Sequence, residues 1–459
     1  MRFLTSAVLS LALATGLHAQ QTQTIYLSGT GLNDTRTWEF RCSAGLKSGK
    51  WGKIEVPSQW ELQGYGEYNY GRGLGPTKPL NEYGEYRHRF KVPSSWKGKD
   101  VKIVFEGVMT DTDVRINGKS AGDVHQGGFY RFEYNISGLL KYGASNKLEV
   151  TVKKESDNAS VNNAERHADW WNFGGIYRPV YLTCTAPEHI EHYAIDARAN
   201  GVMTVSLDVR NAPEGSSVEY TLSPLAAPKR IVNSHTMPLK SPEQTDTLVW
   251  GRVQSWDCEH PNLYILKMAL LAPDGSRLHE VEQRVGFRTV ELRPKDGLYV
   301  NGTKVVLKGI NRHTFHPEGG RCTDREISLM DARLIKEMNM NAVRSHYPPD
   351  THFLDICDSL GIFYLDELAG WHGRYDDSVG AILVKEMVRR DVNHPSIIIW
   401  DNGNEGGWNT NLDKLFAKYD PQKRHVIHPW ADFDELDTHH YPTFLTGVGR
   451  FTNGYKVFM

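Results

Sequence analysis

The chain has 459 residues, with 53 Lys and Arg against 55 Asp and Glu, and a formal net charge of -2. This balance gives no electrostatic reason to expect nucleic acid or a membrane surface as a partner. At roughly 100–200 residues per domain, the length predicts two to four domains. The five cysteines show no spacing typical of zinc sites, and we expect them to be mostly free thiols, with one disulfide at most.

The first 19 residues predict an export signal. Arg2 supplies the positive start, an apolar stretch follows over residues 4–17, and Ala19 stands at the expected cleavage site. The apolar stretch is too short to span a bilayer. No cysteine that could carry a lipid anchor follows the cut. We therefore expect the mature protein to be exported, periplasmic or secreted, and soluble.

Residues 20–186 and 187–290 predict two β-domains. In the first, "VKIVFEG" and "KLEVTVKK" alternate in strand fashion, and Asn117-Gly118 predicts a hairpin turn. Turn residues recur at intervals typical of a sandwich or jelly roll. The second domain carries alternating strands with a turn at Asp274-Gly275, and its length suits an immunoglobulin-like sandwich.

From residue 291 strands alternate with amphipathic helices, which predicts a parallel sheet with crossover helices. The predicted strands lie at residues 304–310, 342–346, 362–367, 397–400, 424–428, 437–441 and 455–459. These seven strands are one fewer than a closed (β/α)₈ TIM barrel needs. Residues 291–459 are therefore expected to form an incomplete TIM barrel.

Polar side chains follow most of these strands, at the end where barrel enzymes place their active site. The apolar run of residues 397–400 leads directly to Asn404 and Glu405. Taken singly, each has a structural alternative, because Glu405 could favour the start of the next helix and Asn404 could cap it. Convergence of many such residues on one barrel mouth favours a functional site. The other candidates at strand ends are His313, Arg344, His346, His372, Trp430, His440 and Tyr441.

Four stretches resemble glycoside hydrolase family 2, the family of β-galactosidases, β-glucuronidases and β-mannosidases. Residues 341–365, "NAVRSHYPPDTHFLDICDSLGIFYL", and 391–405, "DVNHPSIIIWDNGNE", are similar to its two barrel signatures. Residues 169–182 are similar to the segment that closes its sugar-binding jelly roll, and 309–320 to its first barrel strand. The resemblance implies a retaining exo-β-glycosidase acting on a carbohydrate, with β-galactosidase first. β-Glucuronidase, β-mannosidase or a non-catalytic carbohydrate-binding remnant are the alternatives.

The resemblance also implies roles for individual residues. Glu405 would be the general acid/base, Asn404 would hold the sugar 2-hydroxyl or the nucleophile, and Asp169 would reach from the jelly roll into the subsite of the cleaved sugar. No cofactor is implied, and "DELAGWHG" lacks the Glu with which some β-galactosidases bind magnesium. Members of the family are often oligomers, so a homo-oligomer is one expectation. The residues that would line the subsite or orient its carboxylates are His313, Arg344 and His346, with His372, Trp430, His440 and Tyr441 added from strand position.

The second carboxyl group is where the sequence departs from the family. Retaining glycosidases use two carboxyl groups ~5–5.5 Å apart, and the family's nucleophile is a Glu at the end of strand seven. Here strand seven is "YKVFM", and no Glu follows before Met459. We expect the nucleophile beyond Met459, and a 459-residue chain that turns over no glycoside and is poorly stable alone. Asp401 stands where the family more often has Gly or Ser, so a further polar group is expected at the barrel mouth.

Overall fold

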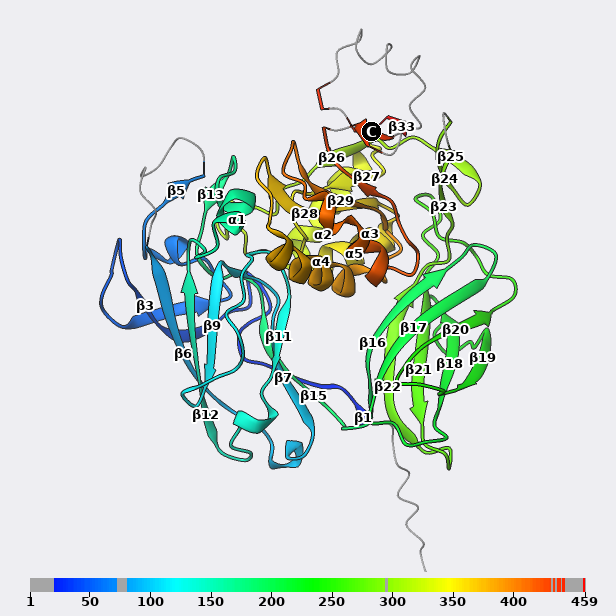
Figure 1. The fold of residues 1–459 in the computed structure, drawn as a ribbon, viewed down its shortest axis with the longest axis horizontal. Coiled ribbons are helices and arrows are strands. Elements are labelled where there is room, and N and C mark those ends of the chain that lie inside the picture. Colours follow the sequence, from blue (N-terminus) through cyan, green and yellow to red (C-terminus); the bar gives the residue numbers. More distant parts are fainter. Residues whose placement is uncertain are drawn as a thin grey trace, which may run out of the picture.

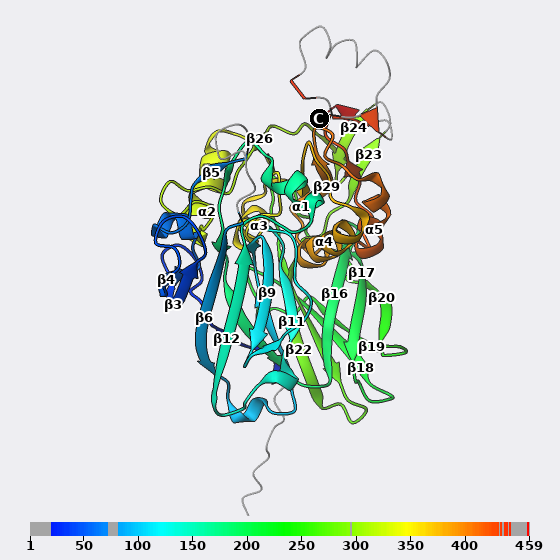
Figure 2. The same cartoon turned by 60° about the vertical axis from the view of Figure 1, so that its left-hand side comes forward.

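The computed structural model describes residues 20–71, 81–293, 296–430, 432–433, 436–438, 440–441 and 457–458. The predicted export signal over residues 1–19 lies outside the described residues. Figure 1 shows two β-domains on either side of a smaller α/β domain. After a 60° turn, the α/β domain is seen seated on the ends of the strands of both β-domains (Figure 2). No helix within the described ranges is long and apolar enough to cross a membrane.

The first domain packs a six-stranded sheet against a four-stranded one. In spatial order the first sheet contains β10 (Lys119–Ser120), β9 (Asp111–Ile116), β12 (Ser145–Lys153), β6 (Tyr83–Lys91), β3 (Arg36–Cys42) and β4 (Gly52–Val56). The second contains β11 (Phe132–Asn135), β7 (Asp100–Phe105), β15 (Val180–Thr185) and β2 (Gln23–Tyr26). One apolar core lies between them. The predicted hairpin turn is confirmed, because Asn117 and Gly118 have φ of 53° and 83° between paired strands.

The second domain is also a sandwich. One sheet contains β1 (Gln20–Gln21), β22 (Arg277–Val285), β21 (Tyr264–Leu271), β18 (Ser217–Pro224) and β19 (Asn233–Pro238). The other contains β16 (His189–Ala197), β17 (Val202–Arg210) and β20 (Glu243–Val249). Because β1 pairs in parallel with β22, Gln20 and Gln21 join this sandwich and not the first domain, in which the sequence placed them.

The α/β domain contains a five-stranded parallel sheet. Its strands are β26 (Gly309–Asn311), β27 (Ala342–Arg344), β28 (Phe363–Trp371), β29 (Ile397–Asn404) and β30 (Val426–Ile427). The helices between them are α2 (Arg325–Glu337), α3 (Thr351–Leu360), α4 (Asp377–Asp391) and α5 (Asp413–Tyr419). Alternating parallel strands and helices confirm an incomplete barrel next to two β-domains.

Three predicted barrel strands differ in the structure. Residues 304–310 are not one strand, because the turn at Asn301 and Gly302 closes a hairpin between β24 (Gly297–Val300) and β25 (Thr303–Val305). Together with β23 (Val290–Arg293) this hairpin forms an antiparallel sheet, and only β26 joins the barrel. The predicted strands six and seven, at residues 437–441 and 455–459, lie largely outside the described residues, and their described parts are not paired with the barrel sheet. Instead, β32 (Leu436–Asp437) and β33 (Val457–Phe458) pair with each other, and β32 pairs with β31 (Asp432–Phe433).

The first domain and the α/β domain share one core. Phe129, Tyr130 and Trp170 of the first domain pack among barrel residues such as Leu383. A buried ion pair reinforces the junction, because Arg178 Nε lies 2.6 Å from the carboxylate of Asp350. All five cysteines are free, and four of them are buried, so the single disulfide left open by the sequence is not formed.

Candidate active site

Strand β29 is longer than its apolar run predicts, and this places its polar residues inside the sheet. Asp401, Asn402 and Asn404 all lie within β29, and Glu405 follows directly. Glu405 has a φ of 49°, a left-handed conformation that is uncommon for a residue with a side chain. Such strained positions cluster at functional sites, where the surrounding structure holds them in place.

Glycines allow the loops after β28 and β29 to touch. A Cβ atom on Gly407 would lie 1.6 Å from the carbonyl oxygen of Gly370, and one on Gly403 would lie 2.3 Å from that of Gly407. Neither position could carry a side chain without moving the loop backbone. This close approach brings the residue after β28, His372, beside the residue after β29, Glu405.

Two histidines flank the carboxyl group of Glu405. Its Oε1 lies 2.8 Å from His440 Nδ1, and its Oε2 lies 3.1 Å from His372 Nε2. The Glu405 side chain is 13% exposed, so it is accessible but largely shielded from water. The site therefore offers a carboxyl group with a histidine nitrogen close to each of its two oxygens.

The contacts of His372 show which of its ring nitrogens carries hydrogen. Its Nδ1 lies 3.1 Å from the backbone oxygen of Glu405, and a carbonyl oxygen can only accept, so Nδ1 carries hydrogen. The opposite ring nitrogen, Nε2, lies 3.1 Å from Glu405 Oε2. The His372 ring is therefore held between the backbone oxygen and the carboxyl group of Glu405.

Arg344 organises a second, buried layer. Its Nε lies 2.5 Å from Asp401 Oδ2, its Nη2 lies 2.5 Å from Glu367 Oε2, and Nη2 also donates to Asn404 Oδ1 at 3.0 Å. Asn404 is therefore bonded to a barrel arginine and does not cap the following helix. That role belongs to Asn409, which accepts from the backbone N–H of Asn411.

His346 and His313 line the same end of the sheet as neutral rings. Burial, with the charge of Arg344 next in size, lowers the pKa of His346 to about 2. Burial, followed by the charge of Arg321, lowers the pKa of His313 to about 3. Both rings are therefore uncharged at neutral pH. His346 Nδ1 lies 3.3 Å from Glu367 Oε2, which connects it to the layer around Arg344.

Two tryptophans that are absent from the predicted site form a wall beside these histidines. The ring centroid of Trp371 lies 4.7 Å from that of His346 and 5.2 Å from that of Trp170. Trp170 comes from the first domain and also meets His313 at 5.8 Å. The sequence contained a signal for both, because Trp170 follows the candidate Asp169 and Trp371 precedes the candidate His372.

The remaining candidates lie around this centre with more exposure. Trp430 is 47% exposed and stacks on His440, with ring centroids 6.4 Å apart. Tyr441 is 89% exposed and approaches the same ring edge-on. Asp169 is exposed immediately before Trp170, at the junction of the two domains. The structure thus gathers the candidates into an outer group around Glu405 and an inner group around Arg344.

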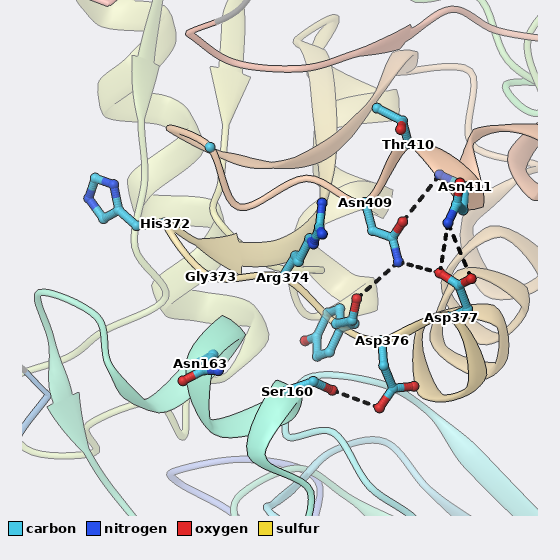
Figure 3. A pocket seen from close by; sticks show the side chains of 12 residues that line it. Ser160, Asn163, His372, Gly373, Arg374, Asp376, Asp377, Asn409, Thr410 and Asn411 are labelled. Atoms are coloured by element: carbon cyan, nitrogen blue, oxygen red, sulfur yellow. Dashed lines mark hydrogen bonds between the residues drawn. The ribbon is translucent and has the colours of Figure 1, made fainter.

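A polar cavity of about 810 Å³ opens beside Glu405. Figure 3 shows His372 at one end, Asp376 and Asp377 at the other, and Ser160 and Asn163 contributed by the first domain. Gly406, the residue after Glu405, also lines it. A volume in this range is typical of sites for small molecules, and the polar lining suits hydroxyl groups.

Two side-chain clusters within the described residues have a geometry that could hold a metal ion, and neither includes Glu405. They are Asp100, His189 and Glu191 in one case and Asp355, Asp358 and His394 in the other. Each already contains a protein cation, since Lys102 Nζ lies 2.5 Å from Glu191 and Arg284 lies 2.9 Å from Asp355. We read both as ion-pair networks.

The three domains match three consecutive models of one family. Residues 42–186 match the sugar-binding domain of glycosyl hydrolases family 2, 188–288 match the model named for the family itself, and 290–426 match its TIM barrel domain. The chain belongs to glycosyl hydrolase family 2. The resemblance seen in the sequence motifs is confirmed.

Individual relatives agree with this assignment. A β-galactosidase of Priestia megaterium is 32% identical over 84% of this chain and 41% of its own length. A β-glycosidase from Bacteroides vulgatus has a similar structure, with a TM-score of 0.75 and 25% identity over 95% of this chain and 58% of its own. A Bacteroides uniformis β-glucuronidase at 22% identity, TM-score 0.73, covering 94% of this chain and 57% of its own, shares the fold. The chain spans about half the length, or less, of the curated relatives it matches.

Proposed function

We propose that this protein takes part in hydrolysis of terminal β-linked sugars by a retaining mechanism, with β-galactosides as the first substrate class. The observation that carries the proposal is Glu405, an accessible carboxyl group at the end of a barrel strand with a histidine on each oxygen. Asn404 beside it, with its amide fixed by Arg344, supports the same site. β-Galactosidase is also the most frequent name among the relatives.

In this proposal Glu405 is the general acid/base. It gives its proton to the glycosidic oxygen as the C1–O bond breaks, and it later takes a proton from water. Asn404 Oδ1 accepts from Arg344, which leaves the amide Nδ2 as the group that would donate to the sugar.

The cavity beside Glu405 is proposed as the place of the leaving group. A general acid stands between the sugar and the group that departs, and the cavity adjoins the acid through His372 and Gly406. Arg374 is exposed on its wall and supplies a cation that can meet hydroxyl or acidic substituents. The sugar itself would occupy the side of Glu405 that faces Asn404 and Arg344.

The position of the nucleophile is proposed from the family resemblance alone. The other carboxyl groups of β28 and β29, those of Asp366, Glu367 and Asp401, are fully buried. Since they are shielded from solvent, none of them offers a free carboxylate to an anomeric carbon. We therefore assign the acid/base to Glu405 and the nucleophile to none of these three residues.

The test uses aryl β-galactosides, β-glucuronides and β-mannosides, with and without added azide. Because the carboxyl groups of Asp366, Glu367 and Asp401 are buried, we expect little phenol to be released without azide. Azide should attack C1 of a dinitrophenyl β-galactoside, displace the phenolate and leave an α-galactosyl azide, because one displacement inverts the anomeric centre. Glu405→Gln should slow substrates with poor leaving groups by about 100-fold or more and leave dinitrophenyl substrates nearly unchanged, because only the former need the acid.

Each outcome bears on a separate part of the proposal. Product from a glucuronide or mannoside alone would replace the galactoside assignment. Rapid hydrolysis without azide would place the nucleophile within these 459 residues. No azide product and no binding of any of the three sugars would overturn the proposed function. Export is proposed from residues 1–19 alone, and fractionation of the producing cells tests it.

A further inference from the structure

Asp401 and Glu367 form a buried carboxyl pair across two neighbouring strands. They are direct partners in the parallel pairing of β28 and β29, so their side chains leave the same face of the sheet. Both side chains are fully buried, and this register sets them side by side. Each also gives one oxygen to the same guanidinium, that of Arg344, at 2.5 Å.

The charges around this pair do not balance if both groups are ionised. Arg344 offers one positive charge to two carboxylates, and His346 beside it is neutral at ordinary pH because burial lowers its pKa to about 2. Two like charges on neighbouring buried side chains disfavour each other, so one of the two groups keeps its proton. One proton on the pair makes the three groups neutral together.

Two buried oxygen atoms without hydrogen-bond donors also indicate one shared proton. Glu367 Oε1 and Asp401 Oδ1 are buried, and neither has a donor among the described residues. A carboxylate oxygen buried without a donor is costly, and native structures rarely keep one. A proton between the two carboxyl groups provides the missing donor for one and the missing acceptor for the other.

We propose that Asp401 is a positioning residue that shares one proton with Glu367, and that this pair holds Arg344 in the orientation in which it fixes the Asn404 amide. Nη2 of Arg344 bridges Glu367 and the Asn404 oxygen. The carboxyl pair and Arg344 together therefore determine whether the oxygen or the nitrogen of the Asn404 amide faces the sugar. The positioning half of this statement rests on the proposed function, whereas the sharing of a proton does not.

The protonation of the Asp401–Glu367 pair should change at alkaline pH. Burial, opposed in part by Arg344, raises the pKa of Glu367 to about 8, and burial raises that of Asp401 as well. The charged or titratable groups that face the pair are Arg344 and His346 from the β27 side and Glu405 from the end of β29, while Asp366 precedes Glu367 on β28. Loss of the shared proton would leave a net negative charge within reach of Glu405.

Carbon-13 NMR of the full chain tests the shared proton without any substrate. Aspartate and glutamate labelled at their carboxyl carbons would be titrated, and Asp401→Asn and Glu367→Gln would assign the signals. We expect the pair to show one protonated carboxyl at neutral pH, which ionises well above the usual range of a carboxyl group and which both variants remove. Asp366→Asn is the control, because it should remove a different signal. Two fully ionised carboxyls at neutral pH would overturn the proposal.

Binding of a non-hydrolysable thio-β-galactoside, measured by calorimetry, tests the positioning role. Asn at position 401 can accept from Arg344 and donate to Glu367, so Asp401→Asn should bind like the wild type at neutral pH and keep that affinity at about pH 9. The wild type should lose about tenfold there, and Asp401→Ser, which reaches neither partner, about tenfold at every pH.

Asp420→Asn is the matched control, since it disturbs a buried Asp–Arg pair, with Arg424, in the segment between α5 and β30 and away from the candidate sugar site. Its affinity should equal that of the wild type. Equal affinities for all four proteins at both pH values would overturn the positioning role. If the wild type binds no galactoside, the proposed function fails, and the NMR titration still decides whether the proton is shared.

Discussion

Replacing Trp170 with alanine should weaken the packing of the first domain against the candidate site. Trp170 is 6% exposed, and its ring lies 5.2 Å from that of Trp371 and 5.6 Å from that of Tyr347. Its Nε1 donates to the backbone oxygen of Glu165 at 3.0 Å. The substitution therefore removes a buried ring, several ring contacts and one buried hydrogen bond at the junction of two domains.

The expected cost follows from this burial. Replacing a buried tryptophan with alanine costs about 3–5 kcal/mol, because the surrounding side chains close the cavity only in part. The neighbouring Trp171→Ala is a matched control. Trp171 is 41% exposed and its ring meets only Tyr68 and Tyr70 among the described residues, so we expect a change below about 1 kcal/mol.

Hydrogen exchange measured by mass spectrometry reports the effect locally. Opening of the junction should become about 100-fold or more easier in Trp170→Ala, because about 1.4 kcal/mol corresponds to a factor of ten. Peptides covering residues 342–375 should exchange faster by that factor, whereas those of the second sandwich should not change. Equal exchange in Trp170→Ala and Trp171→Ala would refute the reasoning.

Three further outcomes can be checked. Because burial raises the pKa of Glu367 to about 8, the folded chain keeps a proton that the unfolded chain releases near pH ~4.3. The contribution of this proton to the free energy of unfolding is complete below pH ~4.3. It is lost as the pH rises towards about 8, at ~1.4 kcal/mol per pH unit. Asp401→Asn should therefore gain stability over the wild type as the pH rises, as urea unfolding at about pH 5 and about pH 8 would show. Arg374→Ala should raise KM several-fold for disaccharides and leave KM for aryl galactosides unchanged, in azide-supported assays of both. Gly407→Ala, whose Cβ would lie 1.6 Å from the oxygen of Gly370, should destabilise the chain by about 2 kcal/mol or more in urea unfolding.

Local signals in the sequence predicted much of the α/β domain. Helix α2 begins after Asp324, whose carboxylate accepts from the N–H of Ile327, and helix α3 ends before Gly361 in a left-handed conformation. Both ends depend on residues within one turn, so they can be predicted without the rest of the chain. The apolar run before Glu405 was sufficient to predict a buried strand for the same reason.

Other features depend on distant partners and could not be predicted. Residues 304–310 are largely apolar and predict one strand, but their pairing is divided between a local hairpin and the barrel. The contact of Trp170 with Trp371 joins positions about 200 residues apart, and no period in either segment indicates it. Asp401 could be noted as unusual for the family, but its bonds to Arg344 and Glu367 depend on the register of three strands.

Glu405 and the buried groups around Arg344 are held by separate contacts. Each can therefore be tested by its own substitution. Glu405 depends on His372, His440 and the touching glycine loops, whereas Asn404 depends on Arg344 and its carboxyl pair. None of these contacts includes a nucleophile. Proton delivery and sugar binding therefore depend on contacts that do not involve the second carboxyl group. If so, Asp401→Ser should weaken galactoside binding while Glu405→Gln leaves binding intact, and calorimetry on the two variants would show this separation. Equal losses of affinity in both would mean that the two layers act as one.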